Sequence, residues 1–196
     1  MKILRIDSSA RYENSVSRQL TNELIARLKR QHPNATVIVR DVAKGLPFVN
    51  EAMVRAYNTS TEERSPEQKS LLQVSDALVE ELTNADIVVI GTPIYNFSVP
   101  ATLKAYIDLV ARAGLTFAYS SEGPRGLLSD RKTYVIVTSG GTPVGSDIDF
   151  ASSYLKHVLS FMGIHDVDII AADSLSRTGS DKLKQVRQQL QAIAIR

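Results

Sequence analysis

Short apolar runs alternate with amphipathic segments along the whole chain, and this alternation restricts the fold more than any other feature. Runs rich in Ile, Val and Leu predict strands over residues 2–7, 36–40, 87–91, 133–139 and 167–172. Between these runs, apolar residues recur at helical spacing. Strands that are apolar throughout and alternate with helices favour a parallel sheet that is covered on both faces. Five such strands predict an α/β fold with the doubly wound strand order 2-1-3-4-5.

Residues that start and stop helices support this arrangement. A first helix is predicted to be capped by Ser15 or Ser17 and to end before Pro33, and a second begins at Pro66, because Pro favours the first helical position. The buried side of this second helix is predicted to consist of Leu71, Leu72, Val74, Leu78, Val79 and Leu82. Further helices are predicted over residues 100–114, 150–162 and 182–193, a long excursion over residues 41–65, and a hairpin insert over residues 117–126.

Size and composition exclude several classes of protein. A chain of 196 residues, 43% of them hydrophobic, suits a single domain over residues 1–196. A formal charge of +2 without a basic stripe argues against a nucleic-acid partner. The absence of cysteine excludes disulfides and thiolate chemistry, and the spacing of the three histidines does not indicate a metal site. No apolar run approaches the ~20 residues of a membrane span, and the start does not resemble a signal peptide, so we expect a soluble, cytoplasmic protein without membrane contact.

Three unusual loops follow the first, third and fourth predicted strands. Residues 8–17 are rich in serine, residues 92–97 read Thr-Pro-Ile-Tyr-Asn-Phe, and residues 138–141 read Thr-Ser-Gly-Gly. In the order 2-1-3-4-5 these three strands are neighbours, and open parallel sheets bind their ligands outside the carboxyl ends of the strands. The sequence therefore predicts one ligand site at which the three loops meet.

The residue types in these loops suit a ligand with a phosphate at one end and a flat ring at the other. The serines precede a helix, whose N-terminus carries free N–H groups and a partial positive charge that favour phosphate. A plain helix cap would explain the same serines. Tyr95 and Asn96 suit a planar ring that forms hydrogen bonds, although core packing would also explain Tyr95 and Phe97. Gly140 and Gly141 permit close approach of the backbone to a ligand, or a turn without one.

The chain resembles the FMN-dependent NADH-azoreductases, which are also called FMN-dependent NADH:quinone oxidoreductases. The resemblance runs nearly end to end and rests on four motifs: Ser9 with Ser15-Val16-Ser17, residues 93–97, residues 103–114 and residues 138–141. It implies a flavodoxin-like three-layer sandwich and a homodimer with one FMN per subunit near the dimer interface. Two departures are visible. The family often has Met at the position of Ile94, and its fourth-strand loop often carries an Arg that this chain lacks at Gly140.

The resemblance implies roles for individual residues, here given in this chain's numbering. The FMN phosphate would be held by Ser9, Ser15, Val16 and Ser17. The isoalloxazine ring would be lined by Ile94, Tyr95, Asn96 and Phe97, and its pyrimidine side approached by Ser139, Gly140 and Gly141. Tyr119 and Phe161 would close the substrate pocket, from the same subunit or from its partner, unless they serve core or interface packing.

The implied activity is a ping-pong, two-electron reduction of quinones and azo compounds. NADH would reduce the flavin before the acceptor enters, with NADPH as an alternative donor. The flavin N5 would carry the chemistry, so no side chain is expected to act as a catalytic residue. The alternative is a flavodoxin-type electron carrier without its own small-molecule substrate, although such carriers are typically acidic. A phospho-receiver domain is disfavoured because Gly91-Thr92-Pro93 follows the third strand in place of an Asp, and a dinucleotide dehydrogenase because the first loop lacks glycine.

Overall fold

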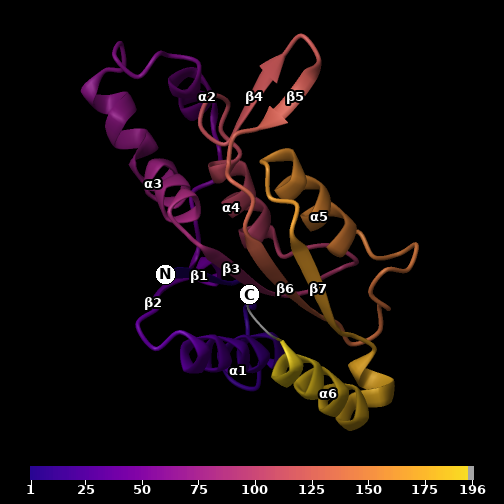
Figure 1. The fold of residues 1–196 in the computed structure, drawn as a ribbon. Helices are drawn as coiled ribbons and strands as arrows, with labels where there is room; N and C mark the ends of the chain where they lie inside the picture. The colour runs from indigo at the N-terminus through magenta and orange to yellow at the C-terminus, as the bar shows by residue number, and fades with distance from the viewer. Residues whose placement is uncertain (194–196) are drawn as a thin grey trace.

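The computed structural model describes residues 1–193 and is built on a central parallel sheet (Figure 1). The strands of this sheet are β1 (Lys2–Asp7), β2 (Thr36–Asp41), β3 (Ile87–Pro93), β6 (Lys132–Thr138) and β7 (Val167–Ala172). Neighbouring strands pair in the order β2-β1-β3-β6-β7, and every pair is parallel. The predicted order 2-1-3-4-5 is therefore confirmed, with β6 and β7 as the fourth and fifth strands.

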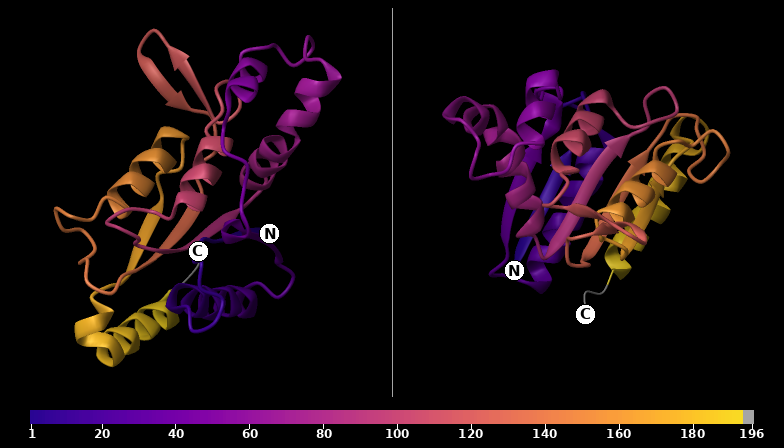
Figure 2. Two further views of the ribbon diagram at one scale, coloured as in Figure 1. Left: turned by 180° about the vertical axis from the view of Figure 1, so that it is seen from behind. Right: turned by 90° about the horizontal axis from the view of Figure 1, so that it is seen from above.

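Helices cover both faces of the sheet and produce three layers (Figure 2). On one face lie α1 (Val16–Gln31) and α6 (Leu175–Ala192). On the other lie α3 (Pro66–Thr83), α4 (Ala101–Val110) and α5 (Ser152–Phe161). Successive residues of β1 point to opposite faces, so Ile3 packs in the core beneath α1 and α6, and Leu4 in the core beneath the other three helices. The flavodoxin-like sandwich expected from the resemblance is thus present.

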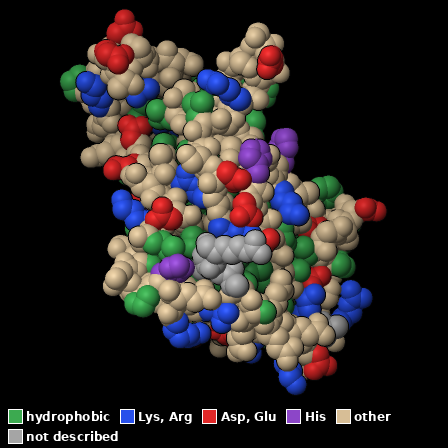
Figure 3. Space-filling model, in the orientation of Figure 1, with side chains coloured by type: hydrophobic (Ala, Val, Ile, Leu, Met, Phe, Trp, Pro, Cys, Tyr) green, Lys and Arg blue, Asp and Glu red, His purple; other side chains and the backbone are tan. Residues whose placement is uncertain are grey.

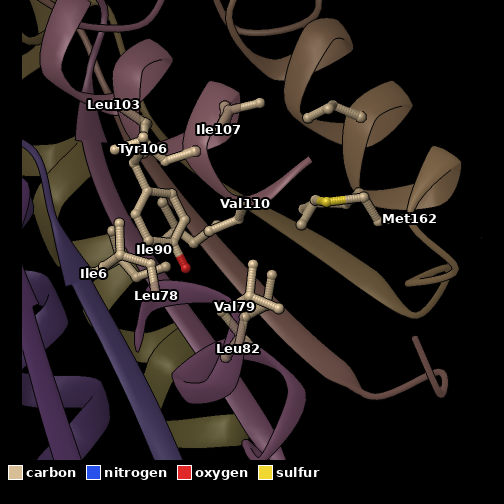
Figure 4. Packing of buried hydrophobic residues seen from close by; sticks show 14 of the residues in the cluster. Ile6, Leu78, Val79, Leu82, Ile90, Leu103, Tyr106, Ile107, Val110 and Met162 are labelled. Carbon is tan, nitrogen blue, oxygen red and sulfur yellow. The ribbon is translucent and has the colours of Figure 1, made fainter. Parts of the chain in front are cut away.

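The larger core lies between the sheet and α3, α4 and α5 (Figure 4). Ile6 and Ile90, from neighbouring strands, pack with helix residues that include Leu78, Leu82, Leu103, Tyr106 and Val110. Full burial of one such aliphatic side chain contributes roughly 1.5–3 kcal/mol. This packing fixes the strands, and with them the loops at their carboxyl ends.

One residue predicted for this core lies outside it. Val74 is 43% exposed, whereas the adjacent Ser75 is fully buried and donates a hydrogen bond to the carbonyl oxygen of Leu109 at 2.6 Å. A buried serine that reaches a helix carbonyl satisfies its hydroxyl, so it occupies the inward position that apolar spacing assigned to Val74.

Three helix boundaries differ from the prediction. α4 ends at Val110 and not at residue 114, because the buried Thr116 hydroxyl donates to the carbonyl oxygen of Val110 at 2.7 Å and accepts from the amide of Arg112 at 2.9 Å. α5 begins at Ser152 and not at residue 150: Ala151 is its N-cap, and the Asp149 carboxylate accepts from the amides of Ala151 and Ser152 at the start of the helix. α6 begins at Leu175, seven residues before the predicted start.

Two segments project from the sandwich beyond the ends of the helices. The excursion over residues 41–65 contains η1 (Val42–Lys44) and α2 (Glu51–Tyr57), and α2 packs on α3. The predicted insert is a hairpin of β4 (Phe117–Ser120) and β5 (Gly123–Gly126), as expected from Gly123-Pro124. Figure 3 shows the hairpin and the α2–α3 end as separate projections with a notch between them.

Candidate cofactor site

A cleft of about 360 Å³ lies at the carboxyl ends of β1, β3 and β6. Its lining comes from the three predicted loops and from α6: Ser9, Arg11, Asn14, Ser15, Val16, Pro93, Ile94, Tyr95, Thr138, Ser139, Gly140, Leu175 and Ser176. The sequence thus predicted correctly that the three loops meet at one edge of the sheet. Leu175 and Ser176 were not predicted, because the first turn of α6 was interpreted as loop.

The serine loop ends in the first turn of α1. Ser15 is the N-cap, and its hydroxyl accepts from the amide of Arg18 at 3.5 Å and lies 3.3 Å from the hydroxyl of Ser17. Ser9 and Ser15 belong to the lining and bring hydroxyls to the cleft, whereas Ser17 lies outside the lining. The first N–H groups of a helix have no partner inside it, and the helix dipole adds partial positive charge. This end of the cleft is therefore suited to a phosphate.

The second loop forms a tight turn from Tyr95 to Ser98. The amide of Tyr95 donates to the carbonyl oxygen of Ser98 at 2.9 Å, and the amide of Ser98 donates back at 3.1 Å. Both central residues have left-handed backbones, with φ of 48° at Asn96 and 72° at Phe97. This combination is typical of a type I′ turn. Its geometry turns Tyr95 into the cleft, while Asn96 lines a neighbouring groove and Phe97 lies half-exposed at the tip.

Hydrogen bonds between the loops fix their relative positions. The amide of Ile94 donates to the carbonyl oxygen of Thr138 at 2.8 Å, which extends the β3–β6 pairing into the site. The amide of Ala10 donates to the hydroxyl of Tyr95 at 3.3 Å and joins the first loop to the second. Main-chain hydrogen bonds and the side chain of Tyr95 therefore connect the three loops across the cleft.

The third loop lies against the start of α6. The amides of Leu175 and Ser176 donate to the carbonyl oxygens of Ser139 and Gly140, each at 3.0 Å. A Cβ atom on Gly140 would come within 3.0 Å of the Ser176 hydroxyl, so the position leaves little room for a side chain. Gly141, which was also predicted to contact the flavin, lies outside the lining of the cleft. Gly140, which stands where the family often has Arg, thus lies directly against the first turn of α6.

A larger apolar groove of about 1000 Å³ adjoins the cleft at Tyr95 and runs between α4 and α5. It is lined by Tyr95, Asn96, Ser98, Val99, Ala101, Lys104, Phe150, Ser153, Tyr154 and His157. Phe150, Tyr154 and His157 were not predicted to line a site, although their spacing of four and three residues would have indicated a common face. Burial, together with the charge of Asp108, raises the pKa of Tyr154 to about 12, so its hydroxyl stays protonated at neutral pH.

Two carboxylates hold the loop that carries Phe150. Asp149 is buried and accepts from the amides of Gly145, Ala151 and Ser152 at 2.8, 2.9 and 3.0 Å. Burial alone would raise the pKa of Asp149, but these bonds and the Ser152 hydroxyl outweigh it and lower the pKa. Asp173 acts similarly, accepting from the amide of Val144 at 2.8 Å beside Lys182. The amide of Phe150 then donates to the carbonyl oxygen of Phe97 at 3.0 Å.

Within one chain, Tyr119 and Phe161 do not reach the cleft. Phe161 ends α5, at the opposite end of that helix from Phe150, and its ring centroid lies 4.5 Å from that of Phe117 at the base of the hairpin. Tyr119 packs edge-on against Phe117 at 5.5 Å and is 76% exposed. The two predicted pocket residues therefore both pack on Phe117, away from the cleft of their own chain.

The donor set of the cleft fits a flavin mononucleotide better than a metal or a nucleic acid. Hydroxyls and a helix start lie at one end, and a tyrosine, Ile94 and closely spaced main-chain groups lie at the other. Among residues 1–193, the structure does not gather three or more His, Asp or Glu side chains into a group that could hold a metal ion. None of the helices described is both long enough and apolar enough to cross a membrane.

Comparison with known proteins agrees with this geometry. A family profile described as a flavodoxin-like fold matches residues 1–194. FMN-dependent NADH:quinone oxidoreductase 1 of Hahella chejuensis is 49% identical over 191 residues, which are 97% of this chain and 94% of that protein. The FMN-dependent NADH:quinone oxidoreductase of Thiobacillus denitrificans is 52% identical over 173 residues, 88% of this chain and 84% of that protein.

Solved structures with a similar fold include azoreductases. An azoreductase from Bacillus anthracis str. Sterne has a TM-score of 0.87 and 27% identity, with 98% of this chain and 100% of that chain covered. An FMN-dependent NADH-azoreductase from Bacillus anthracis str. Ames Ancestor, solved in complex with FMN, has a TM-score of 0.86 and 25% identity over 97% of this chain and 96% of that chain. The chain therefore belongs to the flavodoxin-like family of FMN-dependent NADH:quinone oxidoreductases and azoreductases.

Proposed function

We propose that this protein is an FMN-dependent oxidoreductase that uses NADH to reduce quinones and azo compounds. The observation that carries the proposal is the cleft at the ends of β1, β3 and β6, with hydroxyls and a helix start at one end and Tyr95 beside an open apolar groove at the other. The relatives at 49% and 52% identity are FMN-dependent NADH:quinone oxidoreductases, which supports the same activity.

The three loops would each hold a different part of FMN. Ser9 and the start of α1, residues 15–17, would bind the phosphate through hydroxyls and N–H groups. Residues 94–97 would line the isoalloxazine, and residues 139–141 would approach its pyrimidine side. When bound, FMN would supply the redox chemistry, that is, hydride transfer from the nicotinamide and two-electron reduction of the acceptor.

The chain itself would position the reactants and exclude water from them. Tyr95 accepts from the amide of Ala10, so its own hydroxyl can donate to a group held in the cleft. Main-chain dipoles of residues 140–141 would stabilise negative charge that develops beside them. None of these roles requires a nucleophilic side chain, in keeping with a site made mainly of hydroxyls, aromatic rings and main-chain groups.

The apolar groove between α4 and α5 would receive the flat acceptor and part of a second subunit. Phe150 and Tyr154 supply aromatic surface next to Tyr95 and Asn96. Because Tyr119 and Phe161 lie at the far end of α5, they would serve the cleft of a partner related by a twofold axis. We therefore propose a homodimer in which each hairpin faces the groove of the other subunit.

Flavin analysis and kinetics test this function. The purified protein should be yellow and should release FMN, not FAD, on denaturation. Mixing with NADH in a stopped-flow instrument should bleach the bound flavin rapidly, whereas a flavodoxin-type carrier would not be bleached. Parallel double-reciprocal plots with a quinone would support a ping-pong cycle, and the same assays with NADPH measure donor preference. A protein that cannot be loaded with FMN would refute the proposal.

A further inference from the structure

Arg18, in the first turn of α1, is the residue around which the serine loop folds. Its Nη2 donates to the carbonyl oxygen of Ser9 at 2.7 Å, and its Nε donates to the carbonyl oxygen of Arg11 at 3.1 Å. The guanidinium thus draws two carbonyl groups of the loop toward itself. Arg18 does not belong to the lining of the cleft, so it acts on the loop from behind.

The Arg18 side chain is itself held from several sides. Asp41, the last residue of β2, accepts from both terminal nitrogens at 3.1 and 2.8 Å, and Asp7, the last residue of β1, lies 3.7 Å from Nη1. The guanidinium also lies 4.6 Å from the centre of the Tyr12 ring. A bidentate carboxylate pair fixes the planar fork of an arginine. The two carboxylates, at the ends of β1 and β2, therefore hold the guanidinium in a fixed position beside the loop.

This arrangement decides where the N–H groups of the loop point. In a trans peptide the N–H points away from the carbonyl group to which it is joined, and the structure has no cis peptide among its described residues. With the Ser9 carbonyl directed at Arg18, the amide of Ala10 faces the opposite side, where it donates to the hydroxyl of Tyr95, a lining residue. The Arg11 carbonyl is held in the same way, which turns the amide of Tyr12 away from Arg18.

Carbonyl oxygens that faced the cleft would repel a phosphate, whereas N–H groups attract one. We propose that Arg18 is a positioning residue for the phosphate of FMN: it turns the carbonyl groups of residues 9 and 11 away from the cleft, so that the loop presents donors to the anion. The inference rests on the proposed function. Arg18 itself would not touch the flavin. Its effect would be confined to the phosphate end of the cleft, because other loops build the ring end.

A comparison of FMN with riboflavin, which lacks the phosphate, tests the proposal. Apoprotein of the wild type and of Arg18→Met is titrated with each flavin, and quenching of flavin fluorescence gives the two Kd values. Loss of the charged hydrogen bonds should raise the Kd for FMN by about tenfold or more, and change the Kd for riboflavin by less than about twofold. A role confined to general stability would shift both Kd values together.

Arg40→Met is the matched control. Arg40 also forms a partly buried pair with a carboxylate, Glu81, but the pair joins β2 to α3 and lies outside the cleft. The Arg40→Met substitution should therefore leave the Kd values for FMN and for riboflavin unchanged. Asp41→Asn releases the Arg18 fork while preserving an oxygen acceptor, and it should raise the Kd for FMN selectively even where Arg18→Met fails to fold.

The outcomes are distinct. A selective loss of FMN affinity in Arg18→Met or Asp41→Asn supports the proposal. FMN binding that is unchanged or tighter in both variants, or an equal loss for both flavins, overturns it. A wild-type protein that binds neither flavin would count against the proposed function. If the wild type binds FMN but the Arg18 and Asp41 variants bind it equally well, only the proposal for Arg18 fails.

Discussion

Phe97 has the most strained backbone of the candidate site. Its φ of 72° lies in the left-handed region, which costs an L-residue other than Asn or Gly roughly 1–2 kcal/mol. The strain is held by the reciprocal bonds between Tyr95 and Ser98 and by the bond from the amide of Phe150 to the carbonyl oxygen of Phe97. Strain that is retained by surrounding contacts is common at ligand sites, which agrees with a role of this turn in binding the flavin ring.

Paired substitutions measure this strain directly. Phe97→Gly should be more stable than Phe97→Ala by about 1 kcal/mol, because both lose the ring but only glycine adopts positive φ without cost. At Phe150, a similarly exposed aromatic residue with ordinary backbone, the order should reverse, since glycine there only adds flexibility to the unfolded chain. Urea unfolding of the four apoproteins gives the free energies. An alanine variant at residue 97 that equals or exceeds the glycine variant would show that the turn is unstrained.

Residue types and strand order were sufficient to predict most of the cleft. Ser9, Ser15, Tyr95 and Ser139 follow strands whose neighbours could be inferred, so their convergence followed from the topology. Ser176 could not be found in this way, because the first turn of α6 is defined by hydrogen bonds that its amides donate to a distant loop, and no apolar spacing marks it. The roles of the predicted residues toward FMN stay predictions until the flavin titrations are made.

Packing of α1 on β3 depends on the absence of a side chain at Gly91. A Cβ atom there would lie 2.4 Å from the hydroxyl oxygen of the buried Thr21, which donates to the carbonyl oxygen of Ser17 at 2.7 Å. Gly91 also accepts from the amide of Ser8 at 3.0 Å, so the same contact fixes the start of the serine loop. The close approach of this helix and strand therefore positions the phosphate end of the site.

Gly91→Ala should destabilise the protein by about 2 kcal/mol, since overfilling a packed core costs roughly 1–3 kcal/mol. Thr21→Ala removes the atom that the new methyl group meets, so Gly91→Ala/Thr21→Ala should be more stable than Gly91→Ala alone. Chemical denaturation of the two single variants and the double variant gives the coupling free energy. Additive effects would mean that α1 shifts to accept the methyl group.

Elements were easier to predict than their ends. The alternation of strands and helices predicted the sheet order correctly, because continuous apolar runs have few other arrangements. The end of α4 was missed because Gly114 was interpreted as the residue that ends the helix, whereas the side chain of Thr116 ends it four residues earlier. Side chains that compete for main-chain hydrogen bonds leave no mark on hydrophobic spacing.

The loop over residues 142–150 should respond to acid through Asp149. The pKa of this carboxyl is lowered from 3.8 in the folded state, so its contribution to stability is present above 3.8 and is lost as the pH falls through the lower folded value. The free energy of unfolding should therefore fall on acidification below about pH 5, and less steeply in Asp149→Asn. Urea unfolding at a series of pH values measures both slopes. Asp147→Asn, an exposed change in the same loop, is the control and should retain the wild-type slope.

At the scale of the whole molecule, seven of the twelve aromatic residues form two separated groups. Tyr95, Phe97, Phe150 and Tyr154 gather at the end of α5 near the cleft. Phe117, Tyr119 and Phe161 gather at the hairpin beyond its other end. An isolated two-stranded hairpin is at best marginally stable in water, yet this one projects with Tyr119 76% exposed (Figure 1). A twofold axis between two chains would place each hairpin over the groove of the other, and so cover both groups.

The proposed homodimer predicts a result that a monomeric enzyme would not give. Tyr119→Asp should leave the fold of the subunit intact, because the side chain is largely exposed within one chain. In the dimer it would bury an unpaired charge, which costs about 3–5 kcal/mol and should raise the dimer Kd by about 100-fold or more. Analytical ultracentrifugation across a dilution series measures that Kd, and quinone turnover should fall with the dimer fraction. Val39→Asp, on the edge strand β2, introduces the same charge at an exposed apolar site and should change neither. If both variants sediment and turn over like the wild type, the hairpin is not at a subunit interface and each cleft works alone.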